Sequence, residues 1–308
     1  MNFSDVEKIA DTVLYEGYIL YPYRASSTKN RQRWNFGTLY PKQYAEALRP
    51  AESFQMTTEC LVKSGVETKL DIRVRFLQLV EGEGRGDDTS WQEGVDRSKD
   101  FSNLDLNDVL VMPSTVQFTF VAGETVTNAQ GVSGRLNLGA TRTPEGLIKL
   151  HLELVNVTDV EVPSERNHVL LQSFTSAHVL LGVQDGEFVS LLDPPAEYRS
   201  AVGTCLNVGV FPVLAGGEGR HTMMLCSPII LYDYPEVAAE SAGDFFDSTE
   251  MDEMLALRVL TLTDDEKREM LQDDRSRKIL ERTESLPPEH MMKVHGAIRG
   301  LRRVKEES

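Results

Sequence analysis

Hydrophobic and polar residues alternate with a period of two along much of the middle of the chain. The clearest case is KLDIRVRF at 69–76, where four apolar residues are separated by Asp71, Arg73 and Arg75. Successive side chains of a β-strand point to opposite faces, so this alternation predicts a half-buried strand with a charged outer face. We expect it to belong to a strand pair over residues 52–80.

The same period recurs in TVQFTFV at 115–121 and in GLIKLHLELVNV at 146–157. Glycines and the turn sequence Pro144-Glu145-Gly146 separate these runs at the spacing of hairpins. Shorter apolar runs predict further strands, at 168–172 or beyond, 187–192, 204–211 and 221–231. Strand after strand with turn signals between them predicts an antiparallel β-sandwich or barrel.

Two stretches interrupt this pattern. The polar, glycine-rich and acidic residues 81–94 predict a loop, which ends close to Trp91. The run SFTSAHVLLG at 173–182 interrupts the strands, and a short helix beside the sheet is the alternative to a strand there.

The two ends of the chain differ from the β-rich middle. Residues 13–39 combine tyrosines and β-branched residues with a polar loop, which predicts a hairpin with Pro22 at an edge. After residue 234 the chain is first acidic and then basic, and capping sequences such as Thr263–Glu266 predict three helices.

The sequence therefore predicts an α+β protein with three parts. Residues 51–234 form a mainly antiparallel β-sandwich or barrel-like body. Residues 1–50 form an aromatic and cationic hairpin region packed on the body, and residues 235–308 form a C-terminal three-helix appendage.

Composition narrows the classes of partner. The chain has 308 residues, 48 acidic against 32 basic residues and a formal net charge of −16. That surplus of negative charge opposes binding to nucleic acid and to anionic membranes. Three separate cysteines, no leading apolar segment and no apolar run of membrane-spanning length favour a cytoplasmic protein.

Six histidine and cysteine side chains of the predicted body are candidate metal ligands. They are His151, His168, His178, Cys205, His221 and Cys226. Their spacing matches no closed zinc site, and buried thiols and hydrogen-bonded histidines are the more common outcome. We therefore predict no cofactor and retain a metal ion at these residues as the alternative.

Catalytic motifs give no support for an enzyme. The sequence contains no GxSxG and no GxxxxGK[ST], and its carboxylate pairs fit solvated surfaces. The balance favours a protein without catalytic activity.

The most distinctive stretch, 13–34, joins tyrosines to a cluster of cations and a tryptophan. Its members are Tyr15, Tyr18, Tyr21, Tyr23, Arg24, Lys29, Arg31, Arg33 and Trp34. Packing of an edge hairpin explains the tyrosines, and the net charge opposes a nucleic-acid role. Tyrosine, tryptophan and arginine are also common anchors of protein interfaces, so these residues are our candidate partner-binding patch.

The N-terminal phrase VLYEGYILYPYRASSTKNRQRWNFG and residues 227–270 resemble an uncharacterised bacterial family. Members accompany the accessory genes of uptake-type nickel–iron hydrogenases in actinobacteria and their relatives. The resemblance implies an assembly or interaction role and supplies no site residue.

Three hypotheses follow. The first is a non-enzymatic accessory, assembly or scaffold protein that binds another protein. The resemblance implies that this partner belongs to a nickel–iron hydrogenase system. The second is a metal-handling protein or enzyme that uses the histidines and cysteines of the body. The third is a small-ligand-binding sandwich or barrel, and a homo-oligomer is compatible with each.

Overall fold

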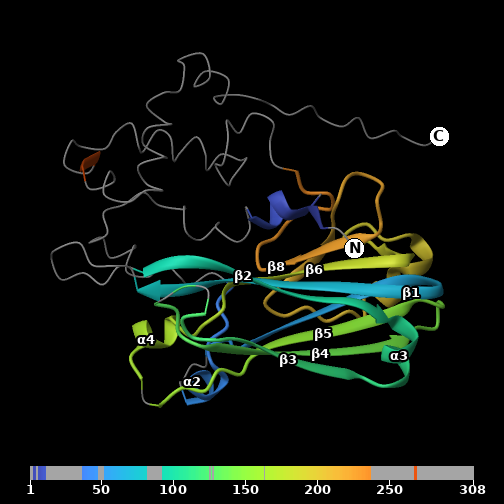
Figure 1. Cartoon of the computed structure of the whole chain (residues 1–308). Coiled ribbons are helices and arrows are strands. Elements are labelled where there is room, and N and C mark those ends of the chain that lie inside the picture. The colour runs from blue at the N-terminus through green and yellow to red at the C-terminus, as the bar shows by residue number, and fades with distance from the viewer. Residues whose placement is uncertain are drawn as a thin grey trace. The chain divides into compact units, whose positions relative to one another are not determined.

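The computed structural model describes the body of the chain and short pieces outside it (Figure 1). The described residues are 3–4, 6–11, 37–47, 52–81, 92–124, 126, 128–162, 164–236 and 267–268. Those up to Glu236 belong to one compact unit, and Lys267 and Arg268 belong to a second. The predicted hairpin between residues 13 and 36 and nearly all of the predicted helical tail lie outside the described residues.

The compact unit is built from one antiparallel sheet and short helical turns. Its strands are β1 (Gln55–Glu81), β2 (Gln92–Asp105), β3 (Ser114–Phe120), β4 (Val132–Arg142), β5 (Ile148–Asn156), β6 (Thr175–Val189), β7 (Phe211–Leu214) and β8 (Met223–Ser227). Its helices are α2 (Lys42–Ala47), α3 (Leu106–Val111), α4 (Arg166–Leu170), η2 (Ala196–Tyr198) and α5 (Arg199–Val202). The prediction of a mainly antiparallel β-rich body is confirmed.

Strand β1 organises the sheet, whose order is β3-β4-β5-β1-β6-β8-β7 with β2 as a branch (Figure 1). The first part of β1 pairs with β5, its last part pairs with β2, and β6 pairs with it along the opposite edge. The described strands thus form one open, branched sheet rather than two separate sheets or a closed barrel.

A bulge divides β1 into these two parts. Its pairing with β6 shifts between Ser64 and Lys69, where Asp185 adopts a φ of 54°. The Asp185 carboxylate accepts a hydrogen bond from the Glu67 N–H at 2.8 Å, and its carbonyl accepts one from the Thr68 hydroxyl. Bulges increase local bending and twist, so this one allows a 27-residue strand to serve two arms of the sheet.

The main core lies between those arms. Even-numbered side chains of β1 and the inward rows of β4, β5 and β6 form one buried cluster. Aromatic rings join the arms: the Phe76 and Phe174 rings stack at 4.1 Å between centroids, and Phe101 of β2 meets Phe118 of β3 at 6.1 Å. Rings in such contact contribute beyond their buried area, so the aromatic cluster ties β3 to β1 and β2.

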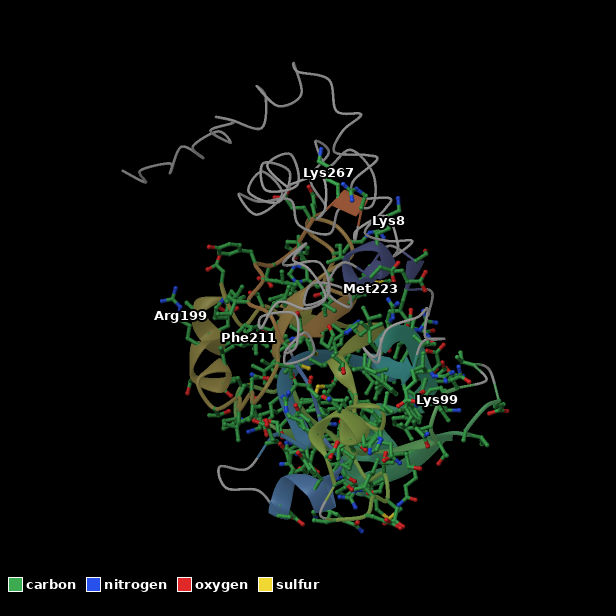
Figure 2. The ribbon with its side chains drawn as sticks, turned by 90° about the vertical axis from the view of Figure 1, so that its left-hand side faces the viewer. Lys8, Lys99, Arg199, Phe211, Met223 and Lys267 are labelled. Carbon is green, nitrogen blue, oxygen red and sulfur yellow. The ribbon has the colours of Figure 1, made fainter. Side chains whose placement is uncertain are left out.

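A second cluster covers the opposite face of β6 and its neighbours. A helical segment at 6–11 places Val6 and Ala10 against Leu180 of β6 and against residues of β7 and β8. Met223 of β8 and Phe211 of β7, labelled in Figure 2, belong to this layer. The sheet is therefore covered on both faces near β6.

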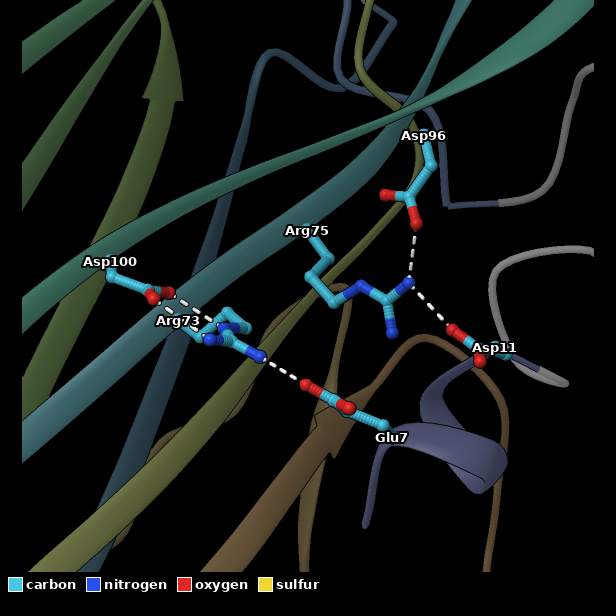
Figure 3. A network of polar contacts seen from close by, with 6 residues as sticks. All are labelled: Glu7, Asp11, Arg73, Arg75, Asp96 and Asp100. Atoms are coloured by element: carbon cyan, nitrogen blue, oxygen red, sulfur yellow. Dashed lines mark hydrogen bonds and ion pairs between the residues drawn. The ribbon is translucent and has the colours of Figure 1, made fainter. Parts of the chain in front are cut away.

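The N-terminal segment also neutralises the arginines of β1 (Figure 3). The Arg73 guanidinium pairs with Glu7 at 2.5 Å and binds both carboxylate oxygens of Asp100, at 2.6 and 2.8 Å. The hydrogen bonds from Asp100 raise the pKa of Arg73 above its usual value, with Glu7 adding to the shift.

Arg75 is buried more deeply, with a side chain only 6% exposed. It donates to Asp11 at 2.7 Å and to Asp96 at 2.6 Å (Figure 3). Burial alone would lower the pKa of Arg75, but the two carboxylates raise it overall. The predicted charged outer face of this strand is thus mostly covered, because carboxylates of residues 6–11 and β2 pair with it.

Several predicted elements were wrong in type. The stretch 52–80 is one long strand rather than a pair, and 204–211 is mainly irregular. The strand predicted at 168–172 or beyond begins later, at Thr175, after helix α4. The alternative of a short helix at 173–182 is wrong, because residues 175–182 are the start of β6, whose first nine residues are all buried. A strand covered on both faces reads as a continuous apolar run, which resembles a buried helix.

Candidate functional site

Strand β3 forms one end of the sheet. Its seven residues pair with β4 in an unbroken register from Ser114 opposite Leu138 to Phe120 opposite Val132. No other described strand pairs with β3. In an antiparallel ladder, every second residue of an end strand points its backbone N–H and C=O groups away from the sheet. These groups form a template for a further strand.

The side chains of β3 carry no charge that would oppose pairing with a further strand. Between Asp108 and Glu124 the sequence contains no charged residue. Along β3, Thr115, Gln117 and Thr119 are exposed. Large apolar side chains are exposed at both ends of the strand: Val111 is 86% exposed, Met112 72% and Val121 57%. We call this surface, residues 111–121, the β3 edge.

The edge of β2 is protected in comparison. Six of its fourteen residues are charged, including Lys99, which is exposed and labelled in Figure 2. Its pairing with β1 shifts between Leu70 and Ile72, near Asn103 with a φ of 65°. Charges and bulges are the usual means by which proteins prevent an edge from pairing.

The remaining edges are short or covered. Strand β7 has four residues and contains Pro212, which lacks an N–H. The free edge at the start of β1 is closed by Val208, which exchanges backbone hydrogen bonds with Thr57 at 3.0 and 2.8 Å. Among the described edge strands, only β3 itself (Ser114–Phe120) contains neither a charged residue nor a proline, and Pro113 directly precedes it.

A glycine on β4 fixes β3 in place. Gly134 lies opposite Phe118, and a Cβ atom at Gly134 would lie 2.2 Å from the tip of the Phe118 ring. The ring therefore lies over bare backbone, where it also contacts Phe101 and Phe120. Packing of an aromatic ring over a cross-strand glycine stabilises sheets and pins their register.

We expect Gly134→Ala to lower the free energy of unfolding by about 1–3 kcal/mol, because the added methyl group overpacks the site of the Phe118 ring. Gly139→Ala is the matched control on the same strand, since nothing lies within 4 Å of its Cβ position. Denaturation in urea measures both variants. Equal stability of the two variants would contradict the packing of Phe118 on Gly134.

The nine predicted partner-binding residues, from Tyr15 to Trp34, lie outside the described residues. That prediction therefore stays a prediction. The β3 edge was not predicted as a binding site, although its strand was. The uncharged run from Val109 to Gly123 was a visible signal, but the position of the strand at a sheet end depends on topology.

The candidate metal ligands are scattered over the sheet. His178 on β6 and Cys226 on β8 are buried, whereas His168 is exposed on α4. The Nδ1 atom of His221 lies 3.2 Å from the Phe188 carbonyl, and its Nε2 lies 3.4 Å from the Tyr234 hydroxyl. Within the described part of the chain, no three His, Cys, Asp or Glu side chains converge to hold a metal ion.

His151 lies instead in a small polar cluster with Glu59. The two ring and carboxylate atoms are 3.1 Å apart, and Lys149 approaches the same carboxylate at 3.5 Å. The Leu206 N–H donates to it at 2.8 Å. Burial would raise the pKa of Glu59, but the Leu206 N–H, His151 and Lys149 lower it overall. Glu59 thus orients His151 and anchors the loop at Leu206.

The three cysteines are free thiols. Burial raises the pKa of Cys60 well above its usual value, that of Cys226 to about 12 and that of Cys205 to about 11. A thiol is a nucleophile or metal ligand only as the thiolate, which these pKa shifts disfavour.

No protein-family model and no curated protein matches this chain. None of the described helices is long and apolar enough to cross a membrane. The functional argument therefore rests on the geometry of the body.

Proposed function

We propose that the protein is a non-enzymatic accessory or scaffold protein that binds an extended segment of another protein along the β3 edge. The observation that carries this proposal is an end strand without charge or proline, flanked by the exposed residues Val111, Met112 and Val121. Addition of a strand supplies main-chain hydrogen bonds for affinity and side-chain pockets for specificity.

The chemistry of the edge indicates the kind of segment. Thr115, Gln117 and Thr119 line its polar face, and Val116 and Phe120 are half-buried on the other. Cross-strand pairs of threonine with threonine or serine, and of aromatic with β-branched residues, are favourable in sheets. The matching segment alternates hydroxyl-bearing residues with β-branched or aromatic ones.

The resemblance of the two ends of the chain directs the first search for the partner. It makes a subunit or maturation protein of a nickel–iron hydrogenase the first candidate, with the cationic stretch Tyr15–Trp34 and the tail after residue 234 as further contact regions. A body that presents one open edge and carries two such ends is suited to holding a partner during assembly.

Two lysines on the β3 edge test the proposal. We expect Gln117→Lys/Thr119→Lys to reduce recovery of the partner from native lysate by at least about tenfold, because edge lysines oppose strand pairing. The matched control adds two lysines at exposed strand positions elsewhere, Ser102→Lys/Thr141→Lys. Circular dichroism and urea denaturation confirm that both variants fold.

The recovered protein is then identified by mass spectrometry and its complex probed by hydrogen exchange. Added protection of the β3 amides in the complex supports strand addition. Equal recovery by the edge variant and its control overturns it. Light scattering measures the oligomeric state of the wild type and of the edge variant. A wild-type dimer that the two lysines dissociate would show that a second copy of this chain pairs with β3, and this result would refute the accessory role of this edge.

A further inference from the structure

A pocket of about 450 Å³ opens between the start of β1 and the segment at 37–40. Tyr40, Glu52, Gln55 and Arg166 give it polar groups, and Leu39 and Met56 belong to its apolar wall. Its volume lies within the range of small-molecule sites, which combine an apolar wall with a few converging polar groups.

Tyr40 and Arg166 form a pair of donors in this pocket. The Arg166 Nη2 atom donates to the Tyr40 hydroxyl oxygen at 2.5 Å, and the guanidinium carbon lies 5.6 Å from the centre of the Tyr40 ring. Tyr40 is only 2% exposed. Burial raises its pKa to about 12, with Arg166 opposing the shift, so the hydroxyl keeps its proton.

The Tyr40 hydroxyl oxygen accepts from Arg166, which leaves the hydroxyl proton to be donated to another group. A buried hydroxyl donor gains free energy when it meets an acceptor, and an oxygen atom of a ligand in the pocket can serve as that acceptor. A carboxylate is suited to this role, because it can accept from a hydroxyl and a guanidinium at once.

Glu52 sets the overall charge of the pocket. Its carboxylate lies 3.9 Å from the Arg166 Nε atom, with the two side chains 40% and 36% exposed. Glu52 would repel a simple anion that approaches Arg166, but it would attract an ammonium group. The pocket thus offers one positive and one negative group side by side.

We propose that this pocket binds a free α-amino acid. The ligand carboxylate accepts from Tyr40 and Arg166, its ammonium donates to Glu52, and an aliphatic side chain packs on Leu39 and Met56. This site is separate from the β3 edge and does not depend on the function proposed for that edge.

Calorimetric titration of the full chain with each common L-amino acid tests the site. We expect binding of at least one aliphatic amino acid, such as leucine. Isoamylamine lacks its carboxylate and 4-methylpentanoate lacks its ammonium, so each should bind at least about tenfold more weakly. The buffer should contain no glycerol, amine or carboxylate, because these molecules would compete with the amino acid for the pocket.

Three variants then assign the contacts. We expect Tyr40→Phe to weaken binding about tenfold and Arg166→Gln by more, because a charge-assisted hydrogen bond is stronger than a neutral one. Glu52→Gln should weaken binding of leucine but not of 4-methylpentanoate. Arg199→Gln, at an exposed arginine on α5 labelled in Figure 2, is the matched control.

The analogues keep the test decisive if a variant does not fold. The proposal is overturned if no amino acid binds, if both analogues bind as tightly as leucine, or if folded Tyr40→Phe retains the wild-type affinity.

Discussion

Replacement of Phe76 by alanine is expected to lower the free energy of unfolding by about 3–5 kcal/mol, the usual cost of removing a buried phenylalanine ring. The Phe76 side chain is 0% exposed, and its ring stacks on Phe174 at 4.1 Å and meets Phe120 edge-on at 5.7 Å. Phe120 belongs to β3 and Phe174 precedes β6. The ring therefore joins β1 to β3 and to the segment before β6, and its loss leaves a cavity that the open sheet cannot close without moving an arm.

Chemical denaturation monitored by circular dichroism measures this loss. Tyr232→Ala is the matched control, since Tyr232 is an aromatic residue that is 87% exposed, and a change within about 0.5 kcal/mol is expected there. Phe76→Leu should recover part of the stability, because it refills much of the cavity. A loss below about 1 kcal/mol for Phe76→Ala would contradict the aromatic packing between the arms.

The sheet could be predicted best where it has one face in solvent. The run 146–157 contains β5. Its residues Ile148, Leu150 and Leu152 are buried, whereas Lys149 on the opposite face is half-exposed. Alternation in the sequence is a direct record of that one-sided burial. The same reasoning located β3, which was predicted at 115–121 and spans Ser114–Phe120.

The prediction failed where neighbours far along the chain decide the environment. Strand β2 has few apolar residues and is held by pairing with β1 and by Arg73 and Arg75. Strand β6 is buried on both faces, so its polar and apolar positions do not alternate. Neither environment is local, and a pattern search along the sequence records only local environments.

The candidate sites show the same division. The lack of charge along β3 is readable from the sequence, but the lack of a neighbour is a property of the strand order. The pocket brings Tyr40 together with Arg166 across 126 positions of the chain, which no spacing rule anticipates. The candidate metal ligands share a region of sequence, but among the described residues no three of them converge, because they lie on three different strands, on α4 and in loops.

His178 supplies the second large prediction, since its imidazole is buried at 0% exposure opposite Arg75. Its Nδ1 lies 2.8 Å from the Ser176 carbonyl, so that nitrogen carries the proton of the neutral ring. Its Nε2 has no hydrogen-bond partner among the residues that the structure describes. A second proton would place an unpaired charge in the sheet beside an arginine. Burial, together with the nearby Arg75, lowers the pKa of His178 from 6.5 to about 3, and the Ser176 carbonyl opposes part of this shift.

Stability should therefore fall in acid through this one residue. Between pH 6.5 and about 3, the unfolded chain binds a proton at His178 that the folded protein does not bind. Each decrease of one pH unit within that window should lower the free energy of unfolding by about 1.4 kcal/mol.

Carboxylates also lose favourable pairing in this range. The quantity to measure is therefore the difference in the free energy of unfolding between wild type and His178→Gln. We expect the wild type to lose stability relative to the variant as the pH falls from 6.5 to 4. His168→Gln, at an exposed position on α4, controls for removal of an imidazole. A constant difference between wild type and His178→Gln across these pH values would show that His178 is not the buried neutral group that opposes acid.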